Sequence, residues 1–150
     1  MNRWRRTFLQ WTGVALAVGS GLVRSGQSYA ATWNKPGFES KALADAIKAL
    51  GATGATESKD IVITAPDIAE NGAVVPIAIQ SRIPNTRSIS ILAEKNPFPL
   101  AATFDVAGSD PYVSTRIKMG QTSNVRAVVQ ADGKFYTAVR EVKITIGGCG

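Results

Sequence analysis

From Ile61 onward, apolar and polar residues alternate with a period of two, which is the pattern of half-buried β-strands. Turn residues separate the alternating runs, and Asn71-Gly72 and Asp132-Gly133 are strong turn signals. The apolar sets that predict strands are Ile61 and Ile63; Val75, Ile77 and Ile79; Ile89 and Ile91; Ala102, Phe104 and Val106; Val113, Thr115 and Ile117; Val125, Ala127 and Val129; and a last run from Phe135. About seven short strands at regular spacing favour an antiparallel β-sandwich of immunoglobulin-like type.

Two of these strands carry further expectations. Pro76 cannot donate a backbone hydrogen bond and therefore favours an edge position for its strand. In the last strand the apolar residues change parity between Val139 and Val142. This change predicts a bulge or bend near Arg140-Glu141.

A single helix is expected before the strands, over about residues 40–50. Its apolar face recurs at positions i, i+3, i+4 and i+7, namely Leu43, Ala46, Ile47 and Leu50. Ser40 is expected to cap its N-terminus and Gly51 to end it. Small and polar residues over 52–59 indicate a loop. The fold class is therefore mainly β, with one N-terminal helix that covers an edge or face of a sheet.

The first thirty residues have the layout of an export signal: a basic start, an apolar stretch over residues 11–23 and small residues before a cut after Ala30. Arg5 and Arg6, followed by Thr-Phe-Leu, are similar to the twin-arginine export signal of bacteria. The alternatives are an ordinary Sec signal and an uncleaved anchor, but the apolar stretch is too short to span a bilayer securely. We therefore expect a periplasmic protein without a stable membrane anchor.

Composition narrows the possible chemistry. The chain has 150 residues and a net charge of +6, from 17 Lys and Arg against 11 Asp and Glu. Loss of residues 1–30 removes four arginines and no acidic residue, so 13 basic and 11 acidic residues remain. This near balance, without a basic run interleaved with aromatics, argues against nucleic-acid binding. The absence of histidine excludes His-based catalysis and the usual His metal sites. The single cysteine excludes an internal disulfide and a Cys-x-x-Cys pair.

The candidate chemistry lies in the last four residues, Gly147-Gly148-Cys149-Gly150. The domain over residues 31–146 is expected to end in a strand, and the glycines then form a thin, flexible arm over residues 147–150. Four residues extend at most about 14 Å. Such an arm could carry the Cys149 thiol into a channel that no folded surface could enter.

Several interpretations of this thiol remain open. No base lies beside Cys149, and a free cysteine is mostly protonated at neutral pH, so it is suited to being acted on by other proteins. A structural or adhesive β-sandwich could use it for an intermolecular disulfide. A thiol enzyme is disfavoured because histidine and a resolving cysteine are absent. Copper carriage is a weaker alternative, because Cys149 and Met119 alone do not make a convincing copper site. Lipid attachment requires a differently placed cysteine. The simplest alternative is that Cys149 is an incidental terminal residue without a function.

The whole chain resembles the SoxY family, the sulfur-carrier subunits of the bacterial Sox thiosulfate-oxidising system. The resemblance covers the signal, the N-terminal helix, the strand-rich body and, most specifically, the terminal Gly-Gly-Cys-Gly. Members of the family typically end in Gly-Gly-Cys-Gly-Gly, so this chain stops one glycine short. The thiol and both leading glycines are present, and the departure bears only on how the tip fits partner active sites.

The resemblance implies a non-catalytic carrier, without a cofactor of its own, in which Cys149 holds the substrate covalently. A haem-containing enzyme would conjugate thiosulfate to the thiol, a sulfate thiohydrolase would release sulfate, and in some systems a sulfur dehydrogenase would oxidise the remaining sulfane sulfur. The resemblance also implies a heterodimer with a second small β-protein, SoxZ, for which a hydrophobic face would be reserved.

Overall fold

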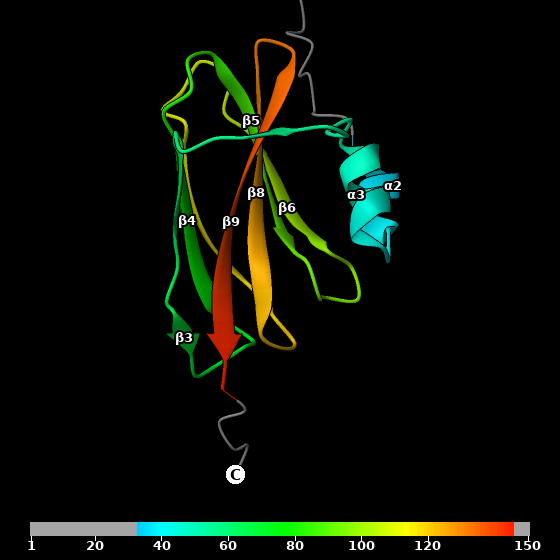
Figure 1. Ribbon diagram of the computed structural model, residues 1–150, viewed down its shortest axis with the longest axis vertical. Coiled ribbons are helices and arrows are strands. Elements are labelled where there is room, and N and C mark those ends of the chain that lie inside the picture. Colours follow the sequence, from blue (N-terminus) through cyan, green and yellow to red (C-terminus); the bar gives the residue numbers. More distant parts are fainter. Residues whose placement is uncertain (1–32, 146–150) are drawn as a thin grey trace, which may run out of the picture. The chain divides into compact units, whose positions relative to one another are not determined.

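The computed structural model describes residues 33–145, in which two short α-helices precede nine β-strands (Figure 1). The helices are α2 (Lys35–Glu39) and α3 (Leu43–Ala49). The strands are β1 (Thr56–Glu57), β2 (Ile61–Thr64), β3 (Ile68–Ala69), β4 (Val75–Ser81), β5 (Thr86–Ala93), β6 (Leu100–Asp105), β7 (Tyr112–Ile117), β8 (Ser123–Ala131) and β9 (Lys134–Ile144). No helix in this range is long and apolar enough to cross a membrane.

The strands form two sheets with a shared core, so the predicted β-sandwich is confirmed. The larger sheet has the order β1-β9-β8-β5-β6, with β3 also pairing with β9, and the smaller has the order β2-β4-β7. Neighbouring long strands are antiparallel, whereas β1 and β3 run parallel to β9. Neither short strand was predicted, because two residues cannot display an alternation. Strand β1 lies in the segment that was expected to be a loop.

The core between the sheets is built from the side chains that the alternating pattern predicts to face inward. Those on β4, β5 and β8 are at most 1% exposed, namely Val75, Ile77, Ile79, Ile89, Ile91, Val125, Ala127 and Val129. On β6 and β7 the same parity faces inward, with Phe104 partly buried and Val113 and Ile117 buried. Burying one large aliphatic side chain contributes about 1.5–3 kcal/mol, so this layer is a major source of stability.

The hairpin between β8 and β9 follows directly from its turn residues. Asp132 and Gly133 both have positive φ, at 49° and 72°. Two consecutive residues of this kind make the type I′ turn whose twist matches that of antiparallel strands. The predicted turn is confirmed, and it starts β9, the strand that leads to the C-terminus (Figure 1).

The helical segment differs from the predicted single helix. Asn34 caps α2 by accepting a hydrogen bond from the Gly37 N–H at 3.1 Å, and Pro36 lies in its first turn, so a separate helix forms there. Ser40 ends α2 in an extended conformation, and its hydroxyl donates to the Pro36 carbonyl, so the prediction that it caps the next helix is wrong. The N-cap of α3 is Ala42, which has no side-chain cap.

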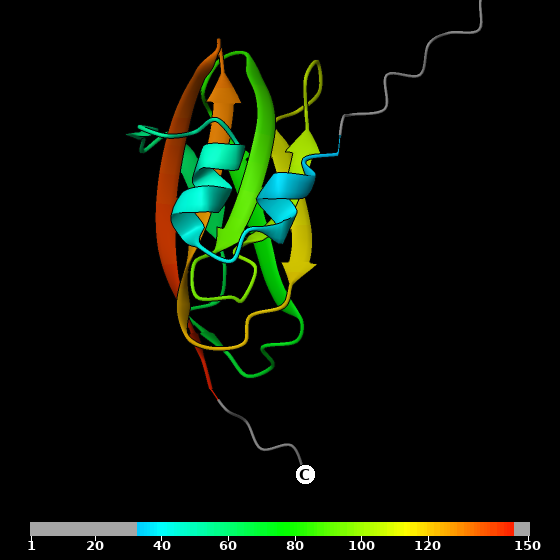
Figure 2. The ribbon, with the colours of Figure 1, turned by 90° about the vertical axis from the view of Figure 1, so that its right-hand side faces the viewer.

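The apolar face of α3 is confirmed. Its residues pack in a second cluster with Leu92, Leu100 and Val128 of the larger sheet. The helices therefore cover the outer face of that sheet, as Figure 2 shows. Gly51 has a φ of 74° directly after the helix, which supports its predicted role as the helix end.

The prediction that the strand containing Pro76 lies at a sheet edge is wrong, because β4 is the central strand of the smaller sheet. Pro76 is tolerated there because β2 pairs with β4 only from Ala78 to Ser81. At Pro76 the strand therefore has a paired neighbour on one side alone, where Arg116 of β7 lies opposite. An absent N–H is compatible with a position that needs only one pairing partner.

The predicted bulge in β9 is also wrong. The register between β8 and β9 runs without interruption from the Ala131–Lys134 pair to the Ser123–Val142 pair. Even-numbered residues of β9 face the core along its length, whereas Phe135, on the other face, packs against the helices. The apolar residues of the sequence therefore change parity because both faces of β9 are packed against other side chains at its start, and not because the register shifts.

Candidate functional site

All site residues predicted from the sequence lie outside the described residues. These are Cys149 and the arm residues Gly147, Gly148 and Gly150 at one end, and the export arginines Arg5 and Arg6 at the other. The structure does describe the segment from which the arm begins, which consists of Lys143, Ile144 and Thr145 and is called the arm root below. Cys149 follows Thr145 by four residues, a distance of at most about 14 Å between Cα atoms.

One side of the arm root is held by β3. Ile68 and Ala69 pair in parallel register with Lys143 and Ile144. The Lys143 N–H donates to the Asp67 carbonyl at 2.9 Å, and the Thr145 N–H donates to the Ala69 carbonyl at 3.2 Å. The strand thus keeps a backbone partner on this side up to the last described residue.

The other side of the arm root is held by a side chain. Backbone pairing between β8 and β9 ends at Ser123 and Val142. Beyond that pair, the hydroxyl of Thr122 accepts a hydrogen bond from the Ile144 N–H at 2.9 Å. The same hydroxyl donates to the Ile144 carbonyl in a longer contact of 3.5 Å. The threonine side chain therefore extends the ladder after the β8 backbone has ended.

The arm root also packs against the loop that precedes β4. Gly72 lies so close to this segment that a Cβ placed on it would overlap the Met119 carbonyl oxygen and lie 3.1 Å from Cγ2 of Ile144. The Met119 N–H in turn donates to the Gly72 carbonyl at 2.7 Å. Only a residue without a side chain fits at this position, where the loop before β4 contacts both the β7–β8 loop and the end of β9.

A third loop, between β5 and β6, is tied to the same end of the sandwich (Figure 1). Asn96 donates to the Lys118 carbonyl at 2.7 Å and accepts from the Gly120 N–H at 3.2 Å. Gln121 donates to the Lys95 carbonyl at 3.2 Å. These contacts join the β5–β6 loop to the β7–β8 loop, which carries Thr122 toward the arm root.

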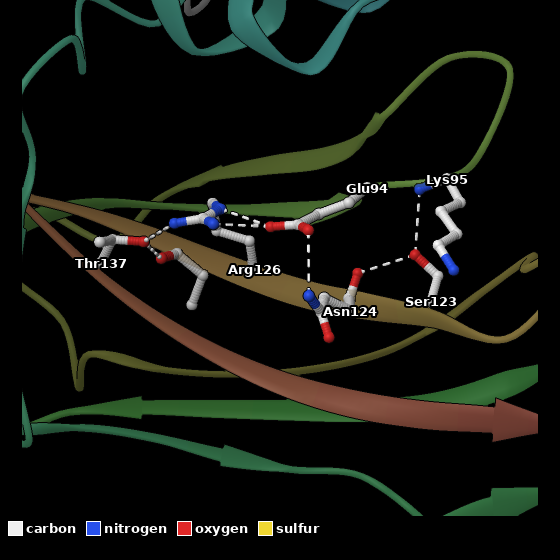
Figure 3. Close-up of polar contacts among 7 residues, drawn as sticks. Glu94, Lys95, Ser123, Asn124, Arg126 and Thr137 are labelled. Carbon is white, nitrogen blue, oxygen red and sulfur yellow. Dashed lines mark hydrogen bonds and ion pairs between the residues drawn. The ribbon is translucent and has the colours of Figure 1, made fainter.

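A polar network fixes where the β5–β6 loop begins (Figure 3). Arg126 of β8 binds Glu94 through Nε at 2.8 Å and through Nη2 at 2.7 Å, with side chains only 25% and 16% exposed. Asn124 donates to the other Glu94 oxygen at 3.2 Å, and Arg126 also donates to Thr137 of β9 at 3.3 Å. The Lys95 N–H donates to Ser123 at 3.0 Å. Both arginine nitrogens contact the same Glu94 oxygen, Oε1, and a partly buried pair of this kind holds its geometry better than an exposed one.

This end of the sandwich also exposes apolar surface. An open hollow of about 460 Å³ is lined by Asn96, Pro97, Phe98, Lys118 and Gly120. Phe98 is 49% exposed, and Ile68 and Val74, which belong to β3 and to the loop before β4, are 57% and 48% exposed. Exposed apolar side chains that gather at one end are typical of a surface that contacts another protein.

The described residues offer little for chemistry of their own. Among residues 33–145 no group of three His, Cys, Asp or Glu side chains could hold a metal ion. Met119, the residue weighed as a copper ligand with Cys149, is 1% exposed in the core between the sheets. Its sulfur therefore faces apolar side chains.

Sequence reasoning missed the residues that hold the arm root. The Asn71-Gly72 dipeptide was predicted as a turn, which the structure confirms: the Asn71 side chain accepts from the Ala73 N–H at 2.9 Å. Its sequence gave no sign that Gly72 also lies against Met119. Thr122 and the pair formed by Glu94 and Arg126 carried no signal either, because each acts across 22 to 32 residues of chain.

Comparison with known proteins agrees with this arrangement. The family model described as sulfur oxidation protein SoxY matches residues 47–149, so the matched range ends on Cys149. The solved structure of the sulfur carrier protein SoxY from Chlorobium limicola f thiosulfatophilum is 46% identical, with a TM-score of 0.60, and the match covers 69% of this chain and 96% of that one. No curated protein matches the chain. The family match over more than two thirds of the sequence shows that this chain belongs to the SoxY family.

Proposed function

We propose that this protein is a covalent sulfur carrier in thiosulfate oxidation and that Cys149 is the attachment point. The observation that carries the proposal is the family match that runs through the sandwich and ends on Cys149, the only cysteine of the chain. The related protein of known structure is itself described as a sulfur carrier. The arm root supports the proposal because it holds the chain firmly four residues before the thiol.

The proposed cycle begins with an oxidative conjugation. The Cys149 thiol and thiosulfate form an S–S bond, giving a cysteine S-thiosulfonate and releasing one proton and two electrons. A haem-containing partner enzyme would take up these two electrons and pass them to an electron acceptor. The partner enzyme thus carries out the oxidation, and this chain supplies the thiol.

The second step releases sulfate. Water attacks the terminal sulfone of the conjugate in a partner thiohydrolase, the bond between sulfane sulfur and sulfone breaks, and a cysteine persulfide, sulfate and a proton result. In some systems a sulfur dehydrogenase then oxidises the persulfide sulfur. The chain contains no histidine to assist either step, which supports a carrier that is acted on rather than an enzyme.

The proposal includes export and partners. Arg5 and Arg6 direct the folded precursor to the periplasm by the twin-arginine route, with cleavage after Ala30. A SoxZ-like small β-protein forms a heterodimer with the chain. The exposed side chains of Ile68 and Phe98 support contact between the arm end of the sandwich and a partner protein.

The test is reconstitution followed by intact-mass analysis. The mature protein is incubated with thiosulfate, the haem-containing partner and an electron acceptor. Wild-type protein should gain the mass of one S–SO₃ group and, after the thiohydrolase is added, retain only one extra sulfur atom. Cys149→Ser should gain nothing while its circular dichroism spectrum stays unchanged. Substantial thiosulfate-dependent loading of the serine variant would refute the proposal, and a disulfide dimer as the sole product would favour the adhesive alternative.

A further inference from the structure

Ile144 is held from three directions, and one of them depends on a single side chain. Its N–H donates to the Thr122 hydroxyl at 2.9 Å. Its side chain packs on the core and on Gly72. The residue before it donates to Asp67, next to β3, and the residue after it donates to Ala69 of β3. Because β8 and β9 stop pairing at Val142, Thr122 is the contact that keeps the arm root attached to β8.

We propose that Thr122 is a positioning residue for the carrier arm: its hydroxyl, together with β3, fixes β9 up to Thr145 and so sets the arm at four residues before the thiol. The inference rests on the proposed function, since it assumes that Cys149 carries the substrate. The inference adds that a residue outside the arm, Thr122, determines the length and direction of the arm. Thr122 is half-buried, and its described contact is with Ile144 of the arm root.

The expected effect follows from the length of chain that is released. Without the Thr122 hydroxyl, β9 is attached on the β8 side only up to Val142, and beyond it the hydrogen bonds to Asp67 and Ala69 and the packing of Ile144 hold the arm root. Whenever these remaining contacts open, seven residues instead of four separate the last bonded residue from Cys149. The effective concentration of a tethered group falls roughly as the −3/2 power of tether length, which gives about a twofold loss when the arm root is open. A less well-defined direction of the arm at its root lowers the loading rate further, because misplaced reacting groups react more slowly.

The test compares Thr122→Val, which removes the hydroxyl at similar size, with Thr122→Ser, which retains it. Thr56→Val is the matched control, because Thr56 is an exposed threonine beside the opposite end of β9, paired with Tyr136. Hydrogen exchange at the Ile144 amide should become about fivefold faster in Thr122→Val, as expected for one lost hydrogen bond. Neither Thr122→Ser nor Thr56→Val should change it by a comparable factor.

Loading by the haem-containing partner with thiosulfate supplies the functional readout. In Thr122→Val the kcat for loading should fall by about twofold, while KM stays unchanged because the docking surface is intact. Labelling of Cys149 by a small thiol reagent should proceed at the wild-type rate in every variant. Thr122→Ser should restore the wild-type kcat.

The outcomes separate this inference from the proposed function. If Thr122→Val loads with the kcat of wild type, or if Thr122→Ser is as impaired as Thr122→Val, the positioning role is overturned and the carrier function stands. If kcat falls but exchange at Ile144 is unaltered, the hydroxyl does not act through the arm root and the inference is likewise overturned. If the wild-type protein itself takes no sulfur from the partner, the carrier function fails and the inference fails with it.

Discussion

Gly72 is the position at which a single methyl group should damage the arm end of the sandwich most. A Cβ there overlaps the Met119 carbonyl oxygen, which belongs to the backbone and cannot rotate away. It also lies 3.1 Å from Cγ2 of Ile144, so the arm root is the second group that must yield. We therefore predict that Gly72→Ala is strongly destabilising, although the φ of Gly72 is not among the positive values.

The magnitude follows from two terms. Forcing an extra methyl group into a packed site costs about 1–3 kcal/mol. The shift that relieves the overlap also strains the hydrogen bond from the Met119 N–H to Gly72, now 2.7 Å long, which is worth about 0.5–1.5 kcal/mol. A total loss of about 2–4 kcal/mol corresponds to a decrease in Tm of roughly 10 °C for a domain of this size.

The assay is urea and thermal unfolding of the mature protein, with Gly120→Ala as the matched control. Gly120 lies in the neighbouring loop, also without positive φ, and a Cβ on it would meet nothing within 4 Å. Gly120→Ala should be neutral or more stable by up to about 1 kcal/mol, because alanine restricts the unfolded chain. Equal free energies of unfolding for the two variants would refute the reasoning, since they differ only in the neighbours of the added methyl group.

Three further predictions concern the arm, the export signal and the helix–sheet contact. Replacing Gly147 and Gly148 together by Ala should leave chemical labelling of the thiol normal but slow enzymatic loading by about an order of magnitude, because each Cβ obstructs a narrow channel; equal loading would make the glycines mere spacers. Arg5→Lys with Arg6→Lys should trap the precursor in the cytoplasm, as cell fractionation will reveal, and efficient export would point to a Sec signal. Leu92→Ala should cost about 2–5 kcal/mol in urea unfolding, because Leu92 is fully buried beneath the helices; a loss under about 1 kcal/mol would contradict the packing.

The alternating pattern was sufficient to predict the long strands and the sandwich. In such strands the side chains of one face enter the core, and the sequence therefore records burial directly, as at Ile77 and Val129. The pattern misled where a strand is covered on both faces. Phe135 and Tyr136 are adjacent in β9 yet pack on opposite sides of the sheet, so their parity carries no information about register.

The sequence proposes a candidate thiol, but it does not predict the contacts that hold the segment before it. Cys149 is conspicuous because it is the only cysteine and follows two glycines. The contacts that hold the arm root are pairwise and distant in sequence, as with Thr122 and Ile144 or Gly72 and Met119. Such contacts have no periodicity, and the residues concerned are of types common in any loop.

The two-residue strands β1 and β3 determine whether β9 is an interior strand or an edge strand of the larger sheet. Without β1 and β3, β9 would be an edge strand of the larger sheet, with one row of backbone groups unpaired. With them it has a partner on both sides near its start and near its end. An interior strand opens far less readily than an edge strand, so the point at which the arm begins is defined by the sheet.

Under the proposed function, a fixed origin for the arm limits how deep the active site of a partner enzyme can lie. The Cα of Cys149 cannot lie more than about 14 Å from that of Thr145, and Thr145 is bonded to Ala69 at the surface of the sandwich. A partner that loads or empties this thiol must therefore bring its reacting atoms to within about that depth of the surface that contacts the arm end. Ile68, which pairs with Lys143 in the arm root and is 57% exposed, must then lie within or beside the contact. A partner with a deeper active site could reach the thiol only if β9 opened beyond Val142, and the three contacts at Ile144 oppose that opening.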